Sequence, residues 1–335
     1  MKIAGFGDFL IHFSPVGDER IAQTNLFEMS FTGAEANVCA ALAYWGEKAE
    51  FVTRIPDNPI AQKGIRFLKS LDVITQNIPL CGNSRMGTYY LENGRHLRPS
   101  YVIYDRDNSA FTRSCYEDYN WDRILKDCTA FYLTGITPAL SENLFLCCLQ
   151  ILKKVREKNI KVFFDINYRS TLIGTDKARD MIVQFLPYIT HIIGNEEHFK
   201  MIFGLSDRYD DDNCEKRLYD ITSKIHNFTG IDNVAVTVRR TVSASENYFY
   251  ASYRQNEEFQ MSNPRRIFVV DRVGSGDAFS AGLIYGINNG YTAKDCVDFA
   301  SASAAFKHTV TKDINFASVE EIKKLQSSCG YDIKR

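Results

Sequence analysis

The residues with the clearest chemical potential form the stretch Asp271-Arg-Val-Gly-Ser-Gly-Asp277. Residues 266–270 before it are apolar and β-branched and predict a buried strand, and the apolar residues after it predict a buried helix. The Gly274-Ser275-Gly276 run lets backbone N–H groups approach an anion closely, and the start of a helix favours negative charge. The spacing therefore predicts a phosphate-binding turn between a strand and a helix.

Asp277 has the chemistry of a catalytic base. A carboxylate beside bound phosphate is costly unless it has a task, such as accepting the proton of a hydroxyl that attacks phosphorus. We expect its place at a helix N-terminus to favour the ionised form. The alternative is an ordinary acidic residue in a first helical turn. No Walker sequence occurs, and Gly5-Phe-Gly7-Asp8 lacks the third glycine of a dinucleotide fingerprint.

The bulk properties exclude several classes of protein. The chain of 335 residues is 45% hydrophobic and carries a formal charge of −1, so it has no basic surface for nucleic acid or anionic membranes. No apolar run is long enough to span a membrane, and Asp8 comes too early for a signal peptide. The nine cysteines form no Cys-x-x-Cys pair, which predicts neither a zinc site nor disulfides, and therefore a cytoplasmic location.

Two further segments place polar residues where ligands bind. Residues 33–46 predict an alanine-rich buried helix, in which Glu35 and Asn37 each need a partner; for Asn37 the alternative is a helix-start hydrogen bond. Residues 160–165 predict a buried strand that is followed by Asn167 and Arg169, at the edge where open α/β sheets bind ligands. A guanidinium holds a carboxylate through two parallel hydrogen bonds, although a loop salt bridge is the alternative.

Two motifs far apart in the chain resemble the signatures of the ribokinase-like (PfkB) sugar kinases. They are Gly33-Ala-Glu-Ala-Asn-Val38 and Gly274-Ser-Gly-Asp-Ala-Phe279, and the resemblance extends over nearly the whole chain. It implies that Gly274, Ser275 and Gly276 form an anion hole for the γ-phosphate of ATP, with Asp277 as the base. It also implies that Gly33 and Asn37 contact substrate hydroxyls.

Asp165-Ile-Asn-Tyr-Arg169 and Tyr104-Asp-Arg106 resemble the 2-keto-3-deoxygluconate kinases within that family. The resemblance implies that Arg169 meets the acid group of a sugar acid. It also implies that Tyr89, Tyr104 and Arg106 face the substrate from a small β-sheet lid. Each of these three could instead be an ordinary hairpin residue; the segment 84–95 is expected to turn at Asn93-Gly94.

The nucleotide side departs from the family pattern. An Asn-x-x-Glu element, which helps to place Mg²⁺ and phosphates, is matched at Asn195, but His198 replaces its Glu, so that Glu196 or Glu197 must take that role. Val238-Arg239-Arg240 replaces a glycine-containing nucleotide turn, which implies a differently shaped loop with Thr237 and Arg239 as candidates for phosphate contact. Lys312 replaces a glycine before Asp313. Residues 206–216, rich in Asp and Arg, predict a solvated loop.

Strands and helices alternate from end to end without a linker or repeat, which predicts a single α/β domain over residues 1–335. The resemblance implies a ribokinase-like, doubly wound, mostly parallel sheet flanked by helices. It also implies a lid formed by segments about 11–32 and 84–112, which forms a homodimer contact.

The combined prediction is an ATP- and Mg²⁺-dependent kinase that phosphorylates the terminal hydroxyl of a keto-sugar acid, most simply 2-keto-3-deoxygluconate. Neither nucleic acid nor a membrane is an expected partner. Two alternatives remain open at this point. One is a fructokinase or another neutral-sugar kinase of the same family, and the other is a non-catalytic sugar-binding regulator on the same scaffold.

Overall fold

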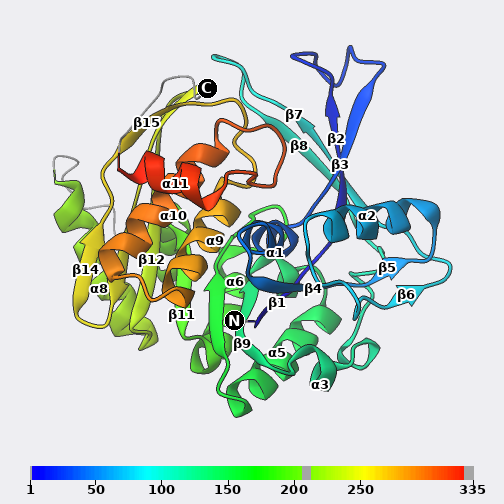
Figure 1. The fold of residues 1–335 in the computed structure, drawn as a ribbon, viewed down its shortest axis with the longest axis horizontal. Coiled ribbons are helices and arrows are strands. Elements are labelled where there is room, and N and C mark those ends of the chain that lie inside the picture. The colour runs from blue at the N-terminus through cyan, green and yellow to red at the C-terminus, as the bar shows by residue number, and fades with distance from the viewer. Residues whose placement is uncertain (1, 206–212, 328–335) are drawn as a thin grey trace.

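The computed structural model describes residues 2–205 and 213–327, which form two main sheets and the helices around them (Figure 1). The large sheet has nine strands, of which those from β12 to β4 pair in parallel and the rest antiparallel. In spatial order they are β14 (Glu258–Met261), β13 (Glu246–Gln255), β12 (Asn233–Ser243), β11 (His191–Asn195), β10 (Lys161–Asp165), β9 (Cys128–Thr134), β1 (Lys2–Phe6) and β4 (Lys48–Val52), with β15 (Arg265–Phe268) paired to β13. This is the predicted doubly wound, mostly parallel architecture.

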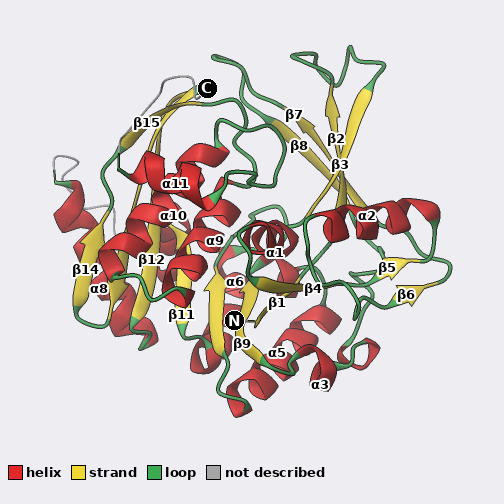
Figure 2. Ribbon diagram, in the orientation of Figure 1, coloured by secondary structure: helices red, strands yellow, loops and turns green. Residues whose placement is uncertain are grey.

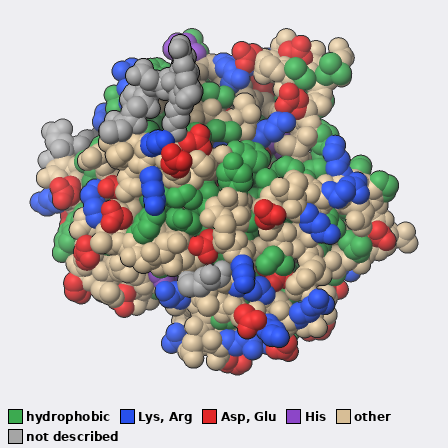
Figure 3. Space-filling view, in the orientation of Figure 1, with side chains coloured by type: hydrophobic (Ala, Val, Ile, Leu, Met, Phe, Trp, Pro, Cys, Tyr) green, Lys and Arg blue, Asp and Glu red, His purple; other side chains and the backbone are tan. Residues whose placement is uncertain are grey.

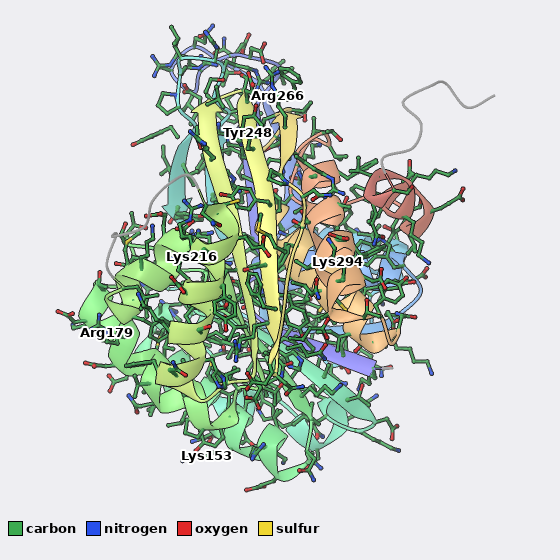
Figure 4. All side chains as sticks on the ribbon, turned by 90° about the vertical axis from the view of Figure 1, so that its left-hand side faces the viewer. Lys153, Arg179, Lys216, Tyr248, Arg266 and Lys294 are labelled. Atoms are coloured by element: carbon green, nitrogen blue, oxygen red, sulfur yellow. The ribbon has the colours of Figure 1, made fainter. Side chains whose placement is uncertain are left out.

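Helices cover both faces of this sheet (Figure 2). One face carries α1 (Ala34–Tyr44), α2 (Pro59–Ser70), α9 (Ser275–Asn288), α10 (Ala293–Lys307) and α11 (Val319–Gln326). The other carries α3 (Trp121–Ile124), α5 (Glu142–Glu157), α6 (Thr175–Phe185), α7 (Glu196–Phe203) and α8 (Cys214–Thr229). Figure 4 shows the sheet edge-on, with Lys216 of α8 on one side and Lys294 of α10 on the other.

The strand sequences explain why two cores form. Successive side chains of a strand point to opposite faces, so a strand covered on both sides reads as a continuous apolar run. In β10, Phe163 packs into the core beneath α1 and α9, whereas Phe164 packs into the core beneath α5 and α6. Both phenylalanines are fully buried.

A second sheet of four strands stands apart from the large one. Its order is β3 (Phe27–Thr32), β2 (Leu10–Pro15), β7 (Gly87–Glu92) and β8 (Tyr101–Asp105), and a separate pair joins β5 (Ile55–Pro56) to β6 (Leu80–Cys81). The strand β7 ends just before Asn93-Gly94, but the connection to β8 runs over residues 93–100 instead of closing as a tight turn. Its tip reaches the β12–β13 hairpin, because His96 N–H donates to Ser245 Oγ (2.8 Å) and His96 O accepts from Ala244 N–H (2.9 Å).

Two further local predictions need correction. The segment 266–270 was expected as a buried strand, but β15 lies at an edge of the sheet and pairs only with β13, which leaves Phe268 68% and Val270 43% exposed. Of the predicted solvated loop 206–216, residues 206–212 lie outside the described residues, and Cys214 already begins α8.

The surface agrees with the near-zero net charge. Acidic and basic side chains are interspersed over the face seen in Figure 3. Among the helices that the structure describes, none combines the length and the apolar character needed to cross a bilayer.

Candidate active site

A cavity of about 980 Å³ lies where the carboxyl ends of the parallel strands meet the small sheet. All thirteen candidate residues from the sequence line it. They are Gly33, Asn37, Tyr89, Tyr104, Arg106, Arg169, Asn195, Thr237, Arg239, Gly274, Ser275, Gly276 and Asp277. The fold therefore brings these residues together, although it leaves the function of each one to be tested.

The phosphate-binding turn has the geometry that its glycines predict. Gly274 caps the N-terminus of α9 in the left-handed region at φ 73°. A Cβ at this residue would lie 1.9 Å from the carbonyl oxygen of Asp313, so both the φ angle and the close approach require glycine. The N–H groups of the first turn of α9 face the cavity end of the helix, where an anion is favoured.

Asp277, in that first turn, is held by the other motif. Asn37 Nδ2 donates to Asp277 Oδ2 at 2.7 Å, and Asn37 Oδ1 accepts from Thr32 Oγ1 at 3.1 Å. Burial, reinforced by the nearby carboxylates of Asp165 and Asp313, raises the pKa of Asp277 to about 8. The expectation of an ionised carboxylate was therefore wrong for this state, because burial outweighs the helix dipole.

Glu35 shows why α1 is fixed so firmly. Its Oε1 accepts from Thr134 N–H (3.0 Å), Thr134 Oγ1 (2.8 Å) and Thr137 Oγ1 (2.9 Å), so the predicted partner exists at the end of β9. Burial still raises the pKa of Glu35 to about 7. Glu35 thus ties the helix that carries Asn37 to the central sheet.

Asp8 is a cavity residue that the sequence reasoning missed. Among the described residues neither carboxylate oxygen has a hydrogen-bond partner, and the nearest cation, Arg106 Nη1, lies 4.0 Å from Oδ2. Burial raises the pKa of Asp8 to about 6. The signal was present in Gly5-Phe-Gly7-Asp8, because Asp8 follows the first parallel strand by two residues, at the edge where open α/β sheets bind ligands.

The lid residues Tyr104 and Arg106 lie against each other, with the Arg106 guanidinium 4.4 Å from the centre of the Tyr104 ring. Tyr89 also lines the cavity, but its hydroxyl donates to Asp313 Oδ1 at 2.6 Å. Although burial opposes it, hydrogen bonds from His12 and Tyr89 and the charge of Lys307 lower the pKa of Asp313. Asp313 and His12 are further residues that the sequence did not single out as part of the site.

Arg169 follows a strained turn after β10. Asn167 adopts φ 36°, which lets its N–H donate to Asp165 Oδ1 at 3.0 Å. Within the described residues the Arg169 guanidinium makes one hydrogen bond, from Nη1 to Tyr168 O at 3.3 Å, and no ion pair. The loop salt bridge that was the alternative is therefore not found there, and the guanidinium lies on the cavity wall.

The nucleotide side carries arginines in place of a glycine turn. The strand β12 continues straight through Val238-Arg239-Arg240 to Ser243, and Arg239 Nη2 donates to Ser275 Oγ at 2.7 Å. Partial removal from water and the nearby Arg272 and Arg169 guanidiniums lower the pKa of Arg239 to about 10. Thr237 Oγ1 donates to Gly194 O at 3.5 Å.

The residues expected near Mg²⁺ differ in availability. Asn195 caps α7 by accepting from His198 N–H at 2.7 Å. Glu196 is buried and lies 3.0 Å from Lys200 Nζ and 3.3 Å from Arg217 Nε, whereas the side chain of Glu197 is 68% exposed. Over the described ranges, no three potential ligands cluster as a ready-made metal site.

Comparison with known proteins gives a consistent picture. Residues 1–320 match the model of the pfkB family carbohydrate kinases. A 2-dehydro-3-deoxygalactonokinase from Haloferax volcanii is 29% identical over 97% of this chain and 96% of its own length.

Solved structures agree with that match. The structure of 2-dehydro-3-deoxygluconokinase from Thermotoga maritima is 37% identical and superimposes with a TM-score of 0.94 over 98% of this chain and 99% of that one. A putative 2-keto-3-deoxygluconate kinase from Enterococcus faecalis is 27% identical, with a TM-score of 0.91 over 100% and 99% of the two chains. The match over the chain, the shared fold and the two signatures at one cavity lead to the same conclusion: this chain belongs to the PfkB family of carbohydrate kinases.

Proposed function

We propose that this carbohydrate kinase transfers the γ-phosphoryl group of ATP to the terminal hydroxyl of a keto-sugar acid, and that 2-keto-3-deoxygluconate or its galacto epimer is the substrate. The observation that carries the proposal is Arg169, whose guanidinium makes no ion pair among the described residues and lies on the wall of the cavity that holds Asp277. Such a group favours an acid over a neutral sugar. The names of the similar kinases point to the same class of substrate.

Asp277 accepts the proton of the attacking hydroxyl in this proposal. Asn37 fixes one carboxylate oxygen, which leaves the other directed at the substrate. Because the pKa of Asp277 is raised, the carboxylate becomes a better proton acceptor once it is ionised. The first-turn N–H groups at Ser275 and Gly276, together with the Arg239 guanidinium, stabilise charge on the transferred phosphoryl group.

ATP is the phosphoryl donor that the family implies, and we propose that Mg²⁺ accompanies it. Mg²⁺ usually keeps several waters and binds mainly to substrate phosphates, with few protein carboxylates. The two candidate glutamates suit that mode, because Glu196 is buried against Lys200 and Arg217, whereas the side chain of Glu197 is 68% exposed and lies 3.5 Å from Lys200 Nζ. Glu197, with Asn195 through water, would hold the ion, which supplies positive charge to the phosphates when bound.

The test measures ADP release with Mg²⁺-ATP and four acceptors: 2-keto-3-deoxygluconate, its galacto epimer, fructose and ribose. Arg169→Ala is expected to lower kcat/KM for the acids by about 100-fold, because a charge-assisted pair is lost. Arg66→Ala, an exposed arginine of α2, is the matched control and should change nothing.

Each outcome separates the candidates. Equal losses on acids and on neutral sugars would remove the carboxylate contact from the proposal. Turnover of fructose and of no other acceptor would favour the alternative that the protein is a neutral-sugar kinase. Sugar binding by calorimetry without ADP release from any acceptor would favour the non-catalytic regulator.

Three parts of the prediction stay proposals. We propose a single domain over residues 1–335 with its lid in about 11–32 and 84–112, a cytoplasmic location, and a homodimer through the lid. The dimer is supported by the outer strand β8, where Tyr101 is 62%, Val102 38% and Ile103 41% exposed. Ile103→Glu should shift the mass measured by light scattering from dimer to monomer; an unchanged mass would remove the lid contact.

A further inference from the structure

Asp313 is a buried carboxylate that receives hydrogen bonds from two strands of the small sheet. Its Oδ2 lies 2.7 Å from His12 Nδ1, and its Oδ1 accepts from Tyr89 OH at 2.6 Å. His12 in β2 and Tyr89 in β7 are register partners, and their rings stack at 4.3 Å with 19° between the planes. All three residues are at most 7% exposed. Both donors therefore come from the lid as one rigid unit.

The other side of Asp313 faces the phosphate-binding turn. Its backbone carbonyl oxygen lies so close to Gly274 that a Cβ there would come within 1.9 Å. The neighbouring Lys312 N–H donates to Asp271 Oδ2 at 3.0 Å, and Val270 N–H donates to His308 O at 2.8 Å. The chain around Asp313 is thus joined to the start of α9 at several points, and a shift of Asp313 cannot leave the turn in place.

A buried lysine supports this junction electrostatically. Lys307, at the end of α10, is fully buried and donates from Nζ to Val310 O at 2.9 Å. Asp271, followed by Asp313 and Asp277, attracts its ammonium, while burial lowers the pKa of Lys307. The negative charge on Asp313 is therefore balanced from behind, so that the carboxylate can keep two donors from the lid.

We propose that Asp313 couples the lid to the anion hole, and that His12, Tyr89 and Asp313 are positioning residues for phosphoryl transfer. The inference rests on the proposed function, since it assigns these residues to the same site. In it, the hydroxyl of Tyr89 acts through Asp313 on the turn that carries Asp277, and does not serve only as a sugar contact. When the lid closes on its substrate, it therefore also positions the groups that bind the transferred phosphate.

A double-mutant cycle tests the coupling. Tyr89→Phe and Asp313→Asn are each expected to lower kcat about tenfold, as expected for loss of a charge-assisted hydrogen bond, and the double variant should lose little more than either single one. His12→Leu should behave like Tyr89→Phe, whereas His12→Asn, which keeps a donor near the Nδ1 position, should recover part of the loss. Tyr90→Phe is the matched control, because Tyr90 lies next to Tyr89 in β7 but packs on Phe13 of β2.

The same cycle is measured by calorimetry with the non-hydrolysable ATP analogue AMP-PNP and Mg²⁺, without an acceptor. Tyr89→Phe is expected to weaken its binding about threefold or more, with no further loss in the double variant. This readout does not require turnover, so it decides the coupling even if every acceptor fails and the proposed function falls. If Asp313→Asn does not fold, the calorimetric measurement can still be made with Tyr89→Phe and His12→Leu.

Two results would overturn the coupling. One is a double variant whose loss of kcat equals the product of the losses in the two single variants, which is the result for independent residues. The other is a Tyr89→Phe enzyme with a raised KM for the sugar but unchanged kcat and unchanged AMP-PNP affinity, which would make the hydroxyl a simple substrate contact.

Discussion

The two halves of the cavity are built on different principles. On the acceptor side, several polar groups satisfy one another: Asn37 with Asp277, Glu35 with two threonines, and Asp313 with Tyr89. The exceptions are Asp8, whose oxygens have no hydrogen-bond partner among the described residues, and Arg169, which makes no ion pair there. On the donor side, Arg239 and Arg272 form hydrogen bonds to hydroxyl, amide and carbonyl oxygens but no ion pair within the described residues.

The difference shows where the protein itself completes the site. Mutually satisfied polar groups are held rigidly, so Asp277 and the groups around it are positioned before any substrate arrives. Uncompensated guanidiniums instead create a positive potential that only an anionic ligand balances. The donor side therefore depends on the phosphates of the nucleotide to complete its electrostatics.

The largest effect is expected from breaking the acceptor side at its centre. Asp277→Asn should lower kcat by about 10³-fold, because the proton acceptor is lost while the Asn37 contact can persist. The measurement is steady-state ADP release, with calorimetry to show that the sugar acid still binds. A variant that retains a tenth of the wild-type kcat would exclude Asp277 as the base.

The donor side should respond differently. Arg239→Ala is expected to lower kcat/KM for Mg²⁺-ATP by about 100-fold, because it removes charge beside Ser275, with little change in the KM of the sugar. Arg240→Ala is the matched control, because Arg240 has the same charge and follows Arg239 in β12 but does not line the cavity. Equal losses in both variants would mean that only the net charge of the strand matters.

The raised pKa of Asp277 predicts a dependence on pH. In the folded chain its carboxyl holds a proton up to about pH 8, whereas the unfolded chain releases it near 3.8. Folding stability attributable to this group therefore falls as pH rises from about 4 to 8, while kcat/KM rises towards pH 8 as the base ionises.

Thermal unfolding of wild type and Asp277→Asn checks this sign. The variant should be the more stable protein at pH 8, on the order of 1 kcal/mol because the carboxyl is partly open to solvent in the cavity, and the two should converge near pH 4. A wild type that gains stability over the variant between pH 5 and 8 would contradict the raised pKa.

The smallest effect concerns the backbone behind the donor side. Lys312 adopts φ 66°, which favours glycine, so Lys312→Gly should raise the free energy of unfolding by about 0.5–1 kcal/mol. Its exposed pair with Glu28 at 3.4 Å contributes little against this gain. Chemical denaturation is the measurement, and Lys312→Ala, which stays strained, should show no such gain.

Much of the fold and the site follows from local sequence. Glycine runs, apolar strands and polar residues after strand ends predicted the α/β sheet, the turn at residues 274–277 and the position of Arg169. The family resemblance supplied most of the other residues that share the cavity, such as Gly33, Tyr89 and Arg239. The family pattern also marked Lys312 as an unusual residue, and its positive φ explains why a glycine is expected there.

The errors have a common physical cause in long-range context. Whether residues 266–270 are buried depends on a neighbouring strand that the sequence does not reveal, and β15 has only β13. The pKa of Asp277 depends on carboxylates brought from Asp165 and Asp313. The role of Asp313 depends on its hydrogen bond with His12, which lies 301 residues away in the sequence, and no local pattern connects the two residues.

The contact of His96 with the β12–β13 hairpin has a consequence for how ligands enter and leave the site. The segment 93–100 and the β12–β13 hairpin both contribute residues to the cavity wall, and the hydrogen bonds of His96 to Ala244 and Ser245 join them on that side. Two hydrogen bonds are a modest barrier, so this joint can open and re-form within a catalytic cycle. Its opening would widen the cavity on that side, and weakening the joint should speed the release of products.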